Sequence, residues 1–322
     1  MTERLTVAVV GASGFVGGAV AAELERCGHA VRWLRAPRQA PVDPARVDAG
    51  VGDPGTRASL LIGVEELARL LADADAVVNC AGDPDASRRD VAALFAANAL
   101  VPGVVGAAAK AAGAARYVHV SSAVVQGRRE VLDSSENVDP FTAYSRSKVA
   151  GERWARAARP EHTVIYRPPS VHAASRRVTR LTGRIARSRL ACVAAPADSP
   201  SPQTLIENVA SAVAFLAVCA PGPDQPPAIV HHPWEGISTA GLLTALSGKV
   251  PRTLPRAPAR GLVRAMEAAG HRAAPLAANA RRVEMIWFGQ RQARSWLQDA
   301  GWSPPAGPDA WEALGRQLAR LA

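Results

Sequence analysis

Tyr144 and Lys148 form the residue pair with the clearest chemical use in this sequence. The chain has three tyrosines and three lysines, and these two lie four residues apart in Tyr144-Ser145-Arg146-Ser147-Lys148. On a helix, residues at this spacing share one face, so the phenol and the ammonium point into the same cleft. A nearby cation stabilises phenolate and lowers the pKa of a tyrosine from its free value of about 10. Tyr144 is therefore a candidate general acid for carbonyl reduction.

The hydroxyl of Ser122 is a second candidate for the same chemistry. It follows an apolar run of strand length, residues 116–120, and so comes at the carboxyl end of a predicted strand. That edge is where open α/β sheets bind their ligands. A serine there can hydrogen-bond to a substrate oxygen and orient it toward the tyrosine.

A glycine-rich turn near the start predicts a site for a dinucleotide. Gly11, Gly14 and Gly17 follow an apolar strand pattern over 5–10 and open a helical pattern over 15–26. At such a turn, free backbone N–H groups and the helix dipole can hold a pyrophosphate. Glycine is needed because a side chain would keep the phosphates away from the backbone.

The end of the second strand, 30–34, indicates which dinucleotide binds. Sites for NAD usually place a carboxylate there to accept from the ribose 2′-OH. Between Arg26 and Val42 the sequence has no Asp or Glu, but it has Arg32, Arg35 and Arg38. An arginine fork can bind a 2′-phosphate, so the sequence favours NADP, held first by Arg35 and second by Arg38. The alternative is that these are solvated surface arginines in an arginine-rich chain.

Strand and helix patterns alternate along the chain and predict an α/β fold with a doubly wound parallel sheet. We expect strands over 5–10, 30–34, 58–62, 76–79, 116–120, 163–166 and 228–230, and helices over 15–26, 65–72, 92–112, 143–158 and 205–219. Residues 37–55 are rich in Pro, Asp and Gly and predict a loop. The predicted Rossmann domain comprises residues 1–169 and 203–233, and a smaller, mostly helical substrate lobe comprises 170–202 and 234–322.

Composition excludes several classes of protein. The 322 residues carry a net charge of +10, and all but three of the 38 basic residues are arginines scattered along the chain. With aromatic residues at only 5%, we expect no nucleic-acid partner. No uncharged apolar run of about 18 residues and no signal-peptide pattern occur, which favours a cytoplasmic protein without a membrane span.

Cysteine and histidine give no metal or disulfide pattern. The four cysteines, which form no close pair, are predicted to be reduced thiols: Cys27, Cys80, Cys192 and Cys219. His231 and His232 are adjacent on a predicted strand and so point to opposite faces, which argues against a shared metal ion.

Together these motifs resemble the short-chain dehydrogenase/reductase superfamily, in its extended branch of NAD(P)-dependent nucleotide-sugar epimerases, dehydratases and reductases. The branch's catalytic residues match Ser122, Tyr144 and Lys148, and Arg167-Pro168-Pro169-Ser170-Val171 matches the element that leads into its substrate lobe. The resemblance implies cofactor contacts in the glycine loop, after the strand at 76–79, on the helix of Asn98 and at these motifs. The implied contact residues are Gly11, Ser13, Gly14, Phe15, Val16, Gly17, Cys80, Ala81, Asn98, Tyr144, Lys148, Pro168 and Val171.

The sequence departs from the branch at three points. Asp53 is a candidate for the acidic residue that lies near the adenine, although its spacing to the next strand is long. Gln126 stands where many members have tyrosine. Sugar 4,6-dehydratases of the branch carry an Asp-Glu pair after the catalytic hydroxyl, whereas Ala123 and Val124 follow Ser122 here, which argues against a dehydratase.

The resemblance predicts an NADPH-dependent reductase of a keto group on a nucleoside-diphosphate-linked deoxysugar. Arg176, Arg180, Arg184 and Arg187 recur at helical spacing and form either a diphosphate-binding face or a solvated one. Three alternatives stay open: an epimerase with a retained NAD, a reductase of a non-nucleotide ketone, and a non-catalytic NADP-binding protein. The resemblance also implies a homodimer through the alanine-rich helices that carry Asn98 and Tyr144.

Overall fold

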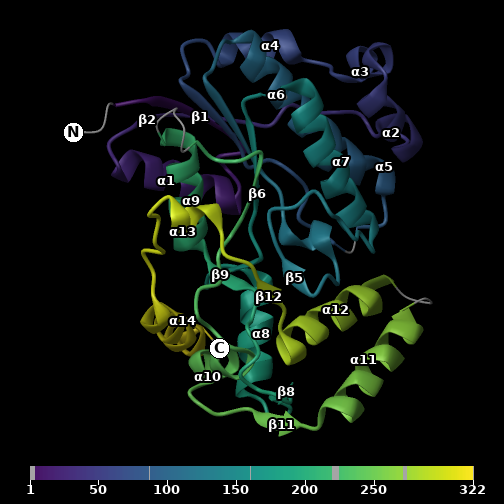
Figure 1. Cartoon of the computed structure of the whole chain (residues 1–322), viewed down its shortest axis with the longest axis vertical. Helices are drawn as coiled ribbons and strands as arrows, with labels where there is room; N and C mark the ends of the chain where they lie inside the picture. The colour runs from purple at the N-terminus through teal and green to yellow at the C-terminus, as the bar shows by residue number, and fades with distance from the viewer. Residues whose placement is uncertain (1–3, 87, 160, 220–224, 271–273, 322) are drawn as a thin grey trace.

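A six-stranded parallel sheet forms the centre of the molecule (Figure 1). The computed structural model describes residues 4–86, 88–159, 161–219, 225–270 and 274–321. The strand order is β10-β6-β4-β3-β1-β2, and all neighbouring strands are parallel. These strands are β1 (Thr6–Val10), β2 (Ala30–Leu34), β3 (Ala76–Asn79), β4 (Arg116–Val120), β6 (Thr163–Arg167) and β10 (Ile229–His231). The predicted doubly wound parallel sheet is thereby confirmed.

Helices cover both faces of this sheet, as its continuously apolar strands require. On one face lie α1 (Phe15–Arg26) and α9 (Ile206–Val218). On the other lie α4 (Val64–Leu70), α6 (Val101–Ala111) and α7 (Ala143–Ala158).

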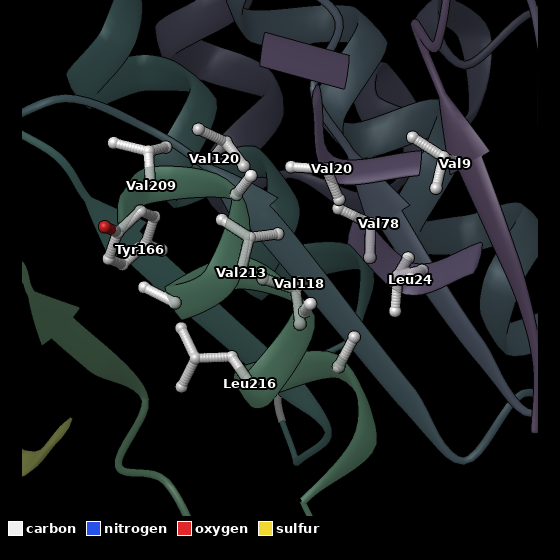
Figure 2. Packing of buried hydrophobic residues seen from close by; sticks show 14 of the residues in the cluster. Val9, Val20, Leu24, Val78, Val118, Val120, Tyr166, Val209, Val213 and Leu216 are labelled. Carbon is white, nitrogen blue, oxygen red and sulfur yellow. The ribbon is translucent and has the colours of Figure 1, made fainter. Parts of the chain in front are cut away.

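Alternate residues of the strands point to opposite faces and build two cores. In β1, Val7 and Val9 belong to the core under α1 and α9, part of which Figure 2 shows, whereas Ala8 and Val10 belong to the core under α4 and α6. All four side chains are completely buried. The sheet is thus fixed from both sides, and the loops at its carboxyl edge start from rigid strands.

The remaining elements form a lobe below the sheet and short additions to it (Figure 1). Three two-stranded parallel pairs join β7 (Ser170–His172) with β9 (Gln203–Leu205), β8 (Cys192–Ala194) with β11 (Arg252–Leu254), and β5 (Val131–Leu132) with β12 (Arg291–Gln292). The helices of the lobe are α8 (Arg177–Arg187), α10 (Thr239–Ser247), α11 (Arg256–Gly270), α12 (Ala274–Phe288) and α14 (Pro308–Arg320), whereas Leu297 of α13 (Trp296–Asp299) belongs to the core under α1 and α9. Trp311 of α14 and Leu242 of α10 are among the side chains of its core.

The strand predicted over 58–62 and the loop predicted over 37–55 are wrong. The segment forms two helices instead, α2 (Pro44–Gly52) and α3 (Pro54–Leu60), and β2 stays the edge strand of the sheet. Each helix begins with an Asp-Pro pair, in which Asp43 or Asp53 caps the first turn and the proline takes the first helical position. Because Asp53 accepts hydrogen bonds from Gly55 and Thr56, its carboxylate caps α3, and the candidate role near the adenine is not supported.

These two helices pack against α7 and the helix that runs from α5 (Val91–Phe95) through a π-helical turn (Ala96–Leu100) into α6. Trp154 of α7 is completely buried and donates a hydrogen bond through Nε1 to the backbone oxygen of Val47, 3.0 Å away. Arg57 donates to the backbone oxygens of Gly50, Val51 and Ala157, and so ties α3 to the ends of α2 and α7.

This packing covers the apolar face through which the sequence predicts a homodimer. Phe95, Ala99, Ala150 and Trp154 are all at most 4% exposed within the single chain. A homodimer stays a prediction, but an interface on this face requires α2 and α3 to move away.

The helical stretch Val91–Ala111 is long and apolar enough to cross a membrane by length and composition, so the expectation that the sequence contains no such run is wrong. In the fold, 72% of its most apolar window is buried, against α7 and the sheet. Its apolar character is thus explained by its place in the core.

Candidate active site

A pocket of about 260 Å³ opens at the carboxyl edge of the sheet and brings the three candidate catalytic side chains together. Ser122, Tyr144 and Lys148 all line it. The predicted cofactor residues that line the same pocket are Val16, Cys80, Ala81, Asn98, Pro168 and Val171. Residues that are up to 155 positions apart in the chain therefore converge where the strands end, as the sequence predicts.

Ser122 lies two residues after the end of β4. It is the N-cap of a short 3₁₀-helix, Ala123–Gln126, and its Oγ accepts from the backbone N–H of Val124 at 3.3 Å. The hydroxyl hydrogen of Ser122 is thus left for a ligand in the pocket. Gln126, in the position where many members of the branch have tyrosine, is completely buried and donates through Nε2 to Asp133 Oδ1, 2.6 Å away.

Tyr144 lies in the first turn of α7. That turn is fixed by a capping box in which Thr142 and Ser145 bond to each other's backbone N–H groups. Burial raises the pKa of Tyr144 above 10, and the guanidinium of Arg176 opposes this rise. The expectation that Lys148 lowers this pKa is not met, because desolvation dominates and the cation that acts on the phenol is Arg176. A raised pKa keeps the phenol protonated at neutral pH, which is the state a proton donor needs.

Lys148 is held between α7 and β4. The residue is 5% exposed, and it donates through Nζ to the backbone oxygen of Val120, 3.1 Å away. Burial lowers the pKa of Lys148 to about 8, although Glu152 and Cys80 act to raise it. Burial in turn raises the pKa of Cys80 to about 12, so this thiol is uncharged in the pocket wall.

A buried ion pair lies one turn behind Lys148 on the same helix. Glu152 accepts two hydrogen bonds from Arg167 at the end of β6, at 2.9 and 2.7 Å, and one from Ser121 Oγ at 2.5 Å. Arg167 also donates to the backbone oxygen of Ser135 at 2.7 Å. Both charged side chains are almost fully buried, so this network fixes α7 relative to β4 and β6.

The glycine loop has the geometry that a dinucleotide phosphate requires. Gly11 has φ of +84°, and a Cβ there would lie 2.8 Å from the backbone nitrogen of Ala81; a Cβ on Gly17 would lie 2.2 Å from the oxygen of Gly11. No side chain caps the first turn of α1, and that turn contains no acidic residue. The N–H groups at Ser13, Phe15 and the following residues are thus suited to an anion.

Arg35 and Arg38 follow β2, next to this loop. The backbone N–H of Gly11 bonds to the oxygen of Leu34, so Arg35 is one residue from the glycine turn. Both arginines are exposed, and in the described part of the chain neither forms a hydrogen bond or ion pair. Arg32 differs, because its guanidinium donates to the backbone oxygen of Ala72.

Asn98 is in the π-helical turn and joins two walls of the pocket. Its Oδ1 accepts from the backbone N–H of Asp83 at 2.8 Å, and its Nδ2 donates to Asp83 O and to Ser147 Oγ, both at 3.1 Å. Its side chain therefore holds the loop after β3 against the catalytic helix. Asp83 is the one carboxylate among the residues that the structure describes around the pocket, and Ala123 and Val124 add none. This fits the argument against a dehydratase.

The four arginines predicted to form one helical face, of which Arg176 is the N-cap of α8 and the other three lie on it, do not share one environment. Arg176 lines the pocket and lies over the ring of Phe15, 5.3 Å from its centroid, whereas Arg187 donates to the backbone oxygen of Leu246 in the lobe core. Arg180 and Arg184 are exposed. The predicted diphosphate face therefore reduces to Arg176 at the pocket and these two exposed arginines.

Sequence reasoning missed Phe141, just before α7, and the residues that the second lobe contributes to the pocket. Arg281, Arg282 and Met285 line it from α12. Their position depends on how α12 folds back over the sheet, and no local motif marks it.

His231 and His232 have separate partners. His231 contacts Ser134 Oγ at 2.8 Å and the backbone oxygen of Ala293 at 2.9 Å, whereas His232 contacts Tyr166 and Glu235. The described ranges contain no group of three or more metal-ligating side chains.

Comparison with known proteins gives one family and a set of weak relatives. The model of the NAD dependent epimerase/dehydratase family matches residues 7–203. Two dTDP-4-dehydrorhamnose reductases of Mycobacterium tuberculosis, from strains CDC 1551 / Oshkosh and ATCC 25618 / H37Rv, are 28% identical over 172 residues, which is 51% of this chain and 49% of each relative. The chain thus spans about half the length of the curated relatives it matches.

Solved structures with the same fold cover almost the whole chain. A UDP-glucuronic acid 4-epimerase from Bacillus cereus in complex with NAD is 18% identical, with a TM-score of 0.63 over 98% of this chain and 99% of that one. A dTDP-4-dehydrorhamnose reductase from Bacillus anthracis in complex with NADP is 17% identical, with a TM-score of 0.59 over 99% and 100%. At these identities the likeness shows the fold.

Proposed function

The chain belongs to the NAD dependent epimerase/dehydratase family, and we propose that within it the protein is an NADPH-dependent reductase of a keto group on a nucleoside-diphosphate-linked deoxysugar. The observation that carries this proposal is the convergence of Ser122, Tyr144 and Lys148 on one pocket beside an uncapped glycine loop. The reductase relatives of Mycobacterium tuberculosis support reduction of this substrate class.

The chain's own residues divide the work of carbonyl reduction. A bound dihydronicotinamide would supply the hydride. Ser122 Oγ, whose hydrogen forms no hydrogen bond in the described part of the chain, donates to the substrate carbonyl oxygen and orients it. Tyr144, kept protonated by burial, gives its proton to that oxygen as negative charge develops. Lys148, whose Nζ is held by the backbone oxygen of Val120, would bind the ribose of the cofactor.

The preference for NADPH rests on Arg35 and Arg38. Both guanidiniums are exposed at the end of β2, where a carboxylate would favour NAD, and they are available to a 2′-phosphate. A neighbouring structure holds NADP and another holds NAD, so the cofactor has to be measured for this chain.

The proposal is tested by following NADPH oxidation with dTDP-4-dehydrorhamnose as substrate and Tyr144→Phe as the control variant. We expect stoichiometric NADPH consumption and a reduced sugar product. An epimerase would instead interconvert two sugars with a catalytic amount of NAD and without net consumption of the cofactor. Absence of both reactions with an intact dinucleotide complex would favour a non-nucleotide ketone or a non-catalytic role.

A further inference from the structure

Helix α8 packs against the lobe with its smaller side chains and turns its larger aliphatic ones outward. Its buried positions are Thr179, Thr182, Gly183 and Ala186. Leu181 is 45% exposed and Ile185 is 42% exposed. A Cβ on Gly183 would lie 2.9 Å from Cδ1 of Leu318 in α14, so the small face fits closely against its neighbour. A helix on the surface of a globular domain usually buries its larger apolar residues, so packing within the chain does not account for Leu181 and Ile185.

Two further aliphatic side chains continue this surface beyond the end of α8. Leu190 is 81% exposed and Val250 is 83% exposed, and each lies two residues before one strand of the parallel pair β8 and β11. Ser188 Oγ donates to the backbone oxygen of Ile185 at 2.8 Å and accepts from the N–H of Leu190 at 3.1 Å, which keeps Leu190 close to the helix. We call the outward face of α8 and these two turns, at the lower end of the molecule in Figure 1, the α8 surface.

A basic residue directly precedes each aliphatic residue of the α8 surface. The four pairs are Arg180-Leu181, Arg184-Ile185, Arg189-Leu190 and Lys249-Val250. All four cations are exposed, and none of their side chains forms a hydrogen bond or ion pair in the described part of the chain. The segments that supply the surface, 162–197 and 236–266, contain no Asp or Glu. The α8 surface thus combines exposed aliphatic groups with positive charge that its own segments do not neutralise.

This combination differs from an ordinary solvated face and from a typical protein interface. Single exposed aliphatic side chains are common on soluble proteins, but a contiguous group of them marks a surface that a partner covers. The centre of a protein interface is depleted in charged residues and enriched in aromatic ones. On the α8 surface each aliphatic side chain has a cation beside it, and none of the eight paired residues is aromatic.

We propose that the α8 surface docks on a lipid bilayer that contains anionic lipids. The negative charge of such a bilayer is complementary to the four cations, and guanidiniums hydrogen-bond well to phosphate. The aliphatic side chains enter the boundary between headgroups and acyl chains, while the long stems of arginine and lysine let their charges stay at the headgroups. Docking of this kind lies in the plane of the interface and requires no membrane-spanning helix.

The proposal does not depend on the proposed reductase activity. None of the eight residues in the four pairs lines the active-site pocket, so their substitution should leave catalysis unchanged. Vesicle binding and turnover are therefore separate measurements, and either one stands if the other fails.

Co-flotation of the whole protein with vesicles tests the aliphatic part of the surface. We expect the wild type to float with vesicles of equal parts phosphatidylglycerol and phosphatidylcholine, and not with phosphatidylcholine alone. Leu190→Ser/Val250→Ser should weaken this binding about fivefold or more without changing the net charge, because two inserted side chains are lost. The matched control, Ile62→Ser/Leu70→Ser, makes the same kind of change at side chains that are 64% and 53% exposed elsewhere, and should bind as the wild type does.

The cations need their own comparison, because a protein with a net charge of +10 is attracted to any anionic surface. Arg189→Gln/Lys249→Gln removes two positive charges from the α8 surface and should also weaken binding about fivefold or more. Arg46→Gln/Arg69→Gln removes two positive charges at exposed positions near the other end of the chain. This control should change binding by less than about twofold, since charges far from the bilayer are screened.

Three results would overturn the proposal. One is a wild type that does not float with the anionic vesicles. Another is equal weakening in the variants and their controls, which would assign the binding to the overall net charge. The third is self-association of the wild type that Leu190→Ser/Val250→Ser abolishes, with no binding to vesicles, because a second copy of the chain would then cover the α8 surface.

Discussion

Lys148 donates a hydrogen bond through Nζ to the backbone oxygen of Val120, 3.1 Å away, and so joins the helix of Tyr144 to the strand that leads to Ser122. The bond fixes the distance between the two elements that carry the proposed chemistry. It also holds a charged group in a buried place, and burial lowers the pKa of Lys148 to about 8. The position of this ammonium and its state of protonation are therefore linked.

The first prediction is a loss of activity as pH rises through about 8 in the free enzyme, because Lys148 then loses its charge. We expect kcat/KM to decrease as the pH rises above about 8. Lys148→Arg, if active, should show no such decrease, since a guanidinium stays charged. Between pH 8 and the ordinary lysine pKa of 10.5, the unfolded chain binds more protons at this site, so the group's contribution to stability rises with pH.

Thermal unfolding measured at the same pH values shows whether activity is lost by titration of Lys148 or by denaturation. The decrease in kcat/KM should occur at pH values where the protein is still folded. If kcat/KM of Lys148→Arg decreased at the same pH, the decrease would have to come from another titrating group.

A second prediction concerns the cofactor. Arg35→Asp should weaken NADPH binding by ~1–3 kcal/mol, because a charge-assisted pair is lost and repulsion is added. Its effect on NADH should be much smaller. Fluorescence titration of both cofactors measures this, with Arg46→Asp on α2 as a control that makes the same charge change at another exposed site. Tighter wild-type binding of NADH than of NADPH would refute the assignment to NADP.

The third prediction is that the buried pair of Glu152 and Arg167 stabilises the fold strongly. Glu152→Gln should lower the free energy of unfolding by about 3–5 kcal/mol, because it leaves the guanidinium of Arg167 buried without its counter-charge. Glu312→Gln, at an exposed pair with Arg316, should cost less than about 1 kcal/mol. Equal effects of the two changes in urea unfolding would show that the buried network has no special role.

The fourth prediction concerns the covering of α7 by α2 and α3. Because Trp154 is completely buried under them, Trp154→Ala should lower the free energy of unfolding by about 3–5 kcal/mol, whereas Trp33→Ala, at a half-exposed ring, should cost far less. Light scattering at micromolar protein tests the homodimer that the family resemblance implies, and a mass of 33.6 kDa would refute it.

Much of the site was predictable because it depends on local motifs and on one rule of sheet geometry. Apolar runs such as Thr6–Val10 are buried on both faces and mark parallel strands. Since all carboxyl ends of these strands meet at one edge, Ser122, Tyr144 and Lys148 reach one pocket although no contact between them is visible in sequence.

The errors have physical causes as well. Asp43-Pro44 and Asp53-Pro54 are helix starts, but their residue types also favour loops, so residues 37–62 were assigned a loop and a strand. The side chain of Arg281 reaches the pocket only through the fold of α12. The pKa of Tyr144 depends on how deeply the phenol is buried, which spacing on a helix does not reveal.

The central claim is that Tyr144 donates the proton in a carbonyl reduction. Ser122→Ala should reduce turnover less than Tyr144→Phe, since the serine orients the substrate but is not proposed to transfer a proton.

The most direct test is the turnover number of Tyr144→Phe, measured beside its affinity for NADPH. We predict that NADPH binding stays intact while turnover falls by about 10²–10⁴, the usual contribution of a general acid. A Tyr144→Phe variant that reduces its keto substrate at the wild-type rate would contradict the mechanism.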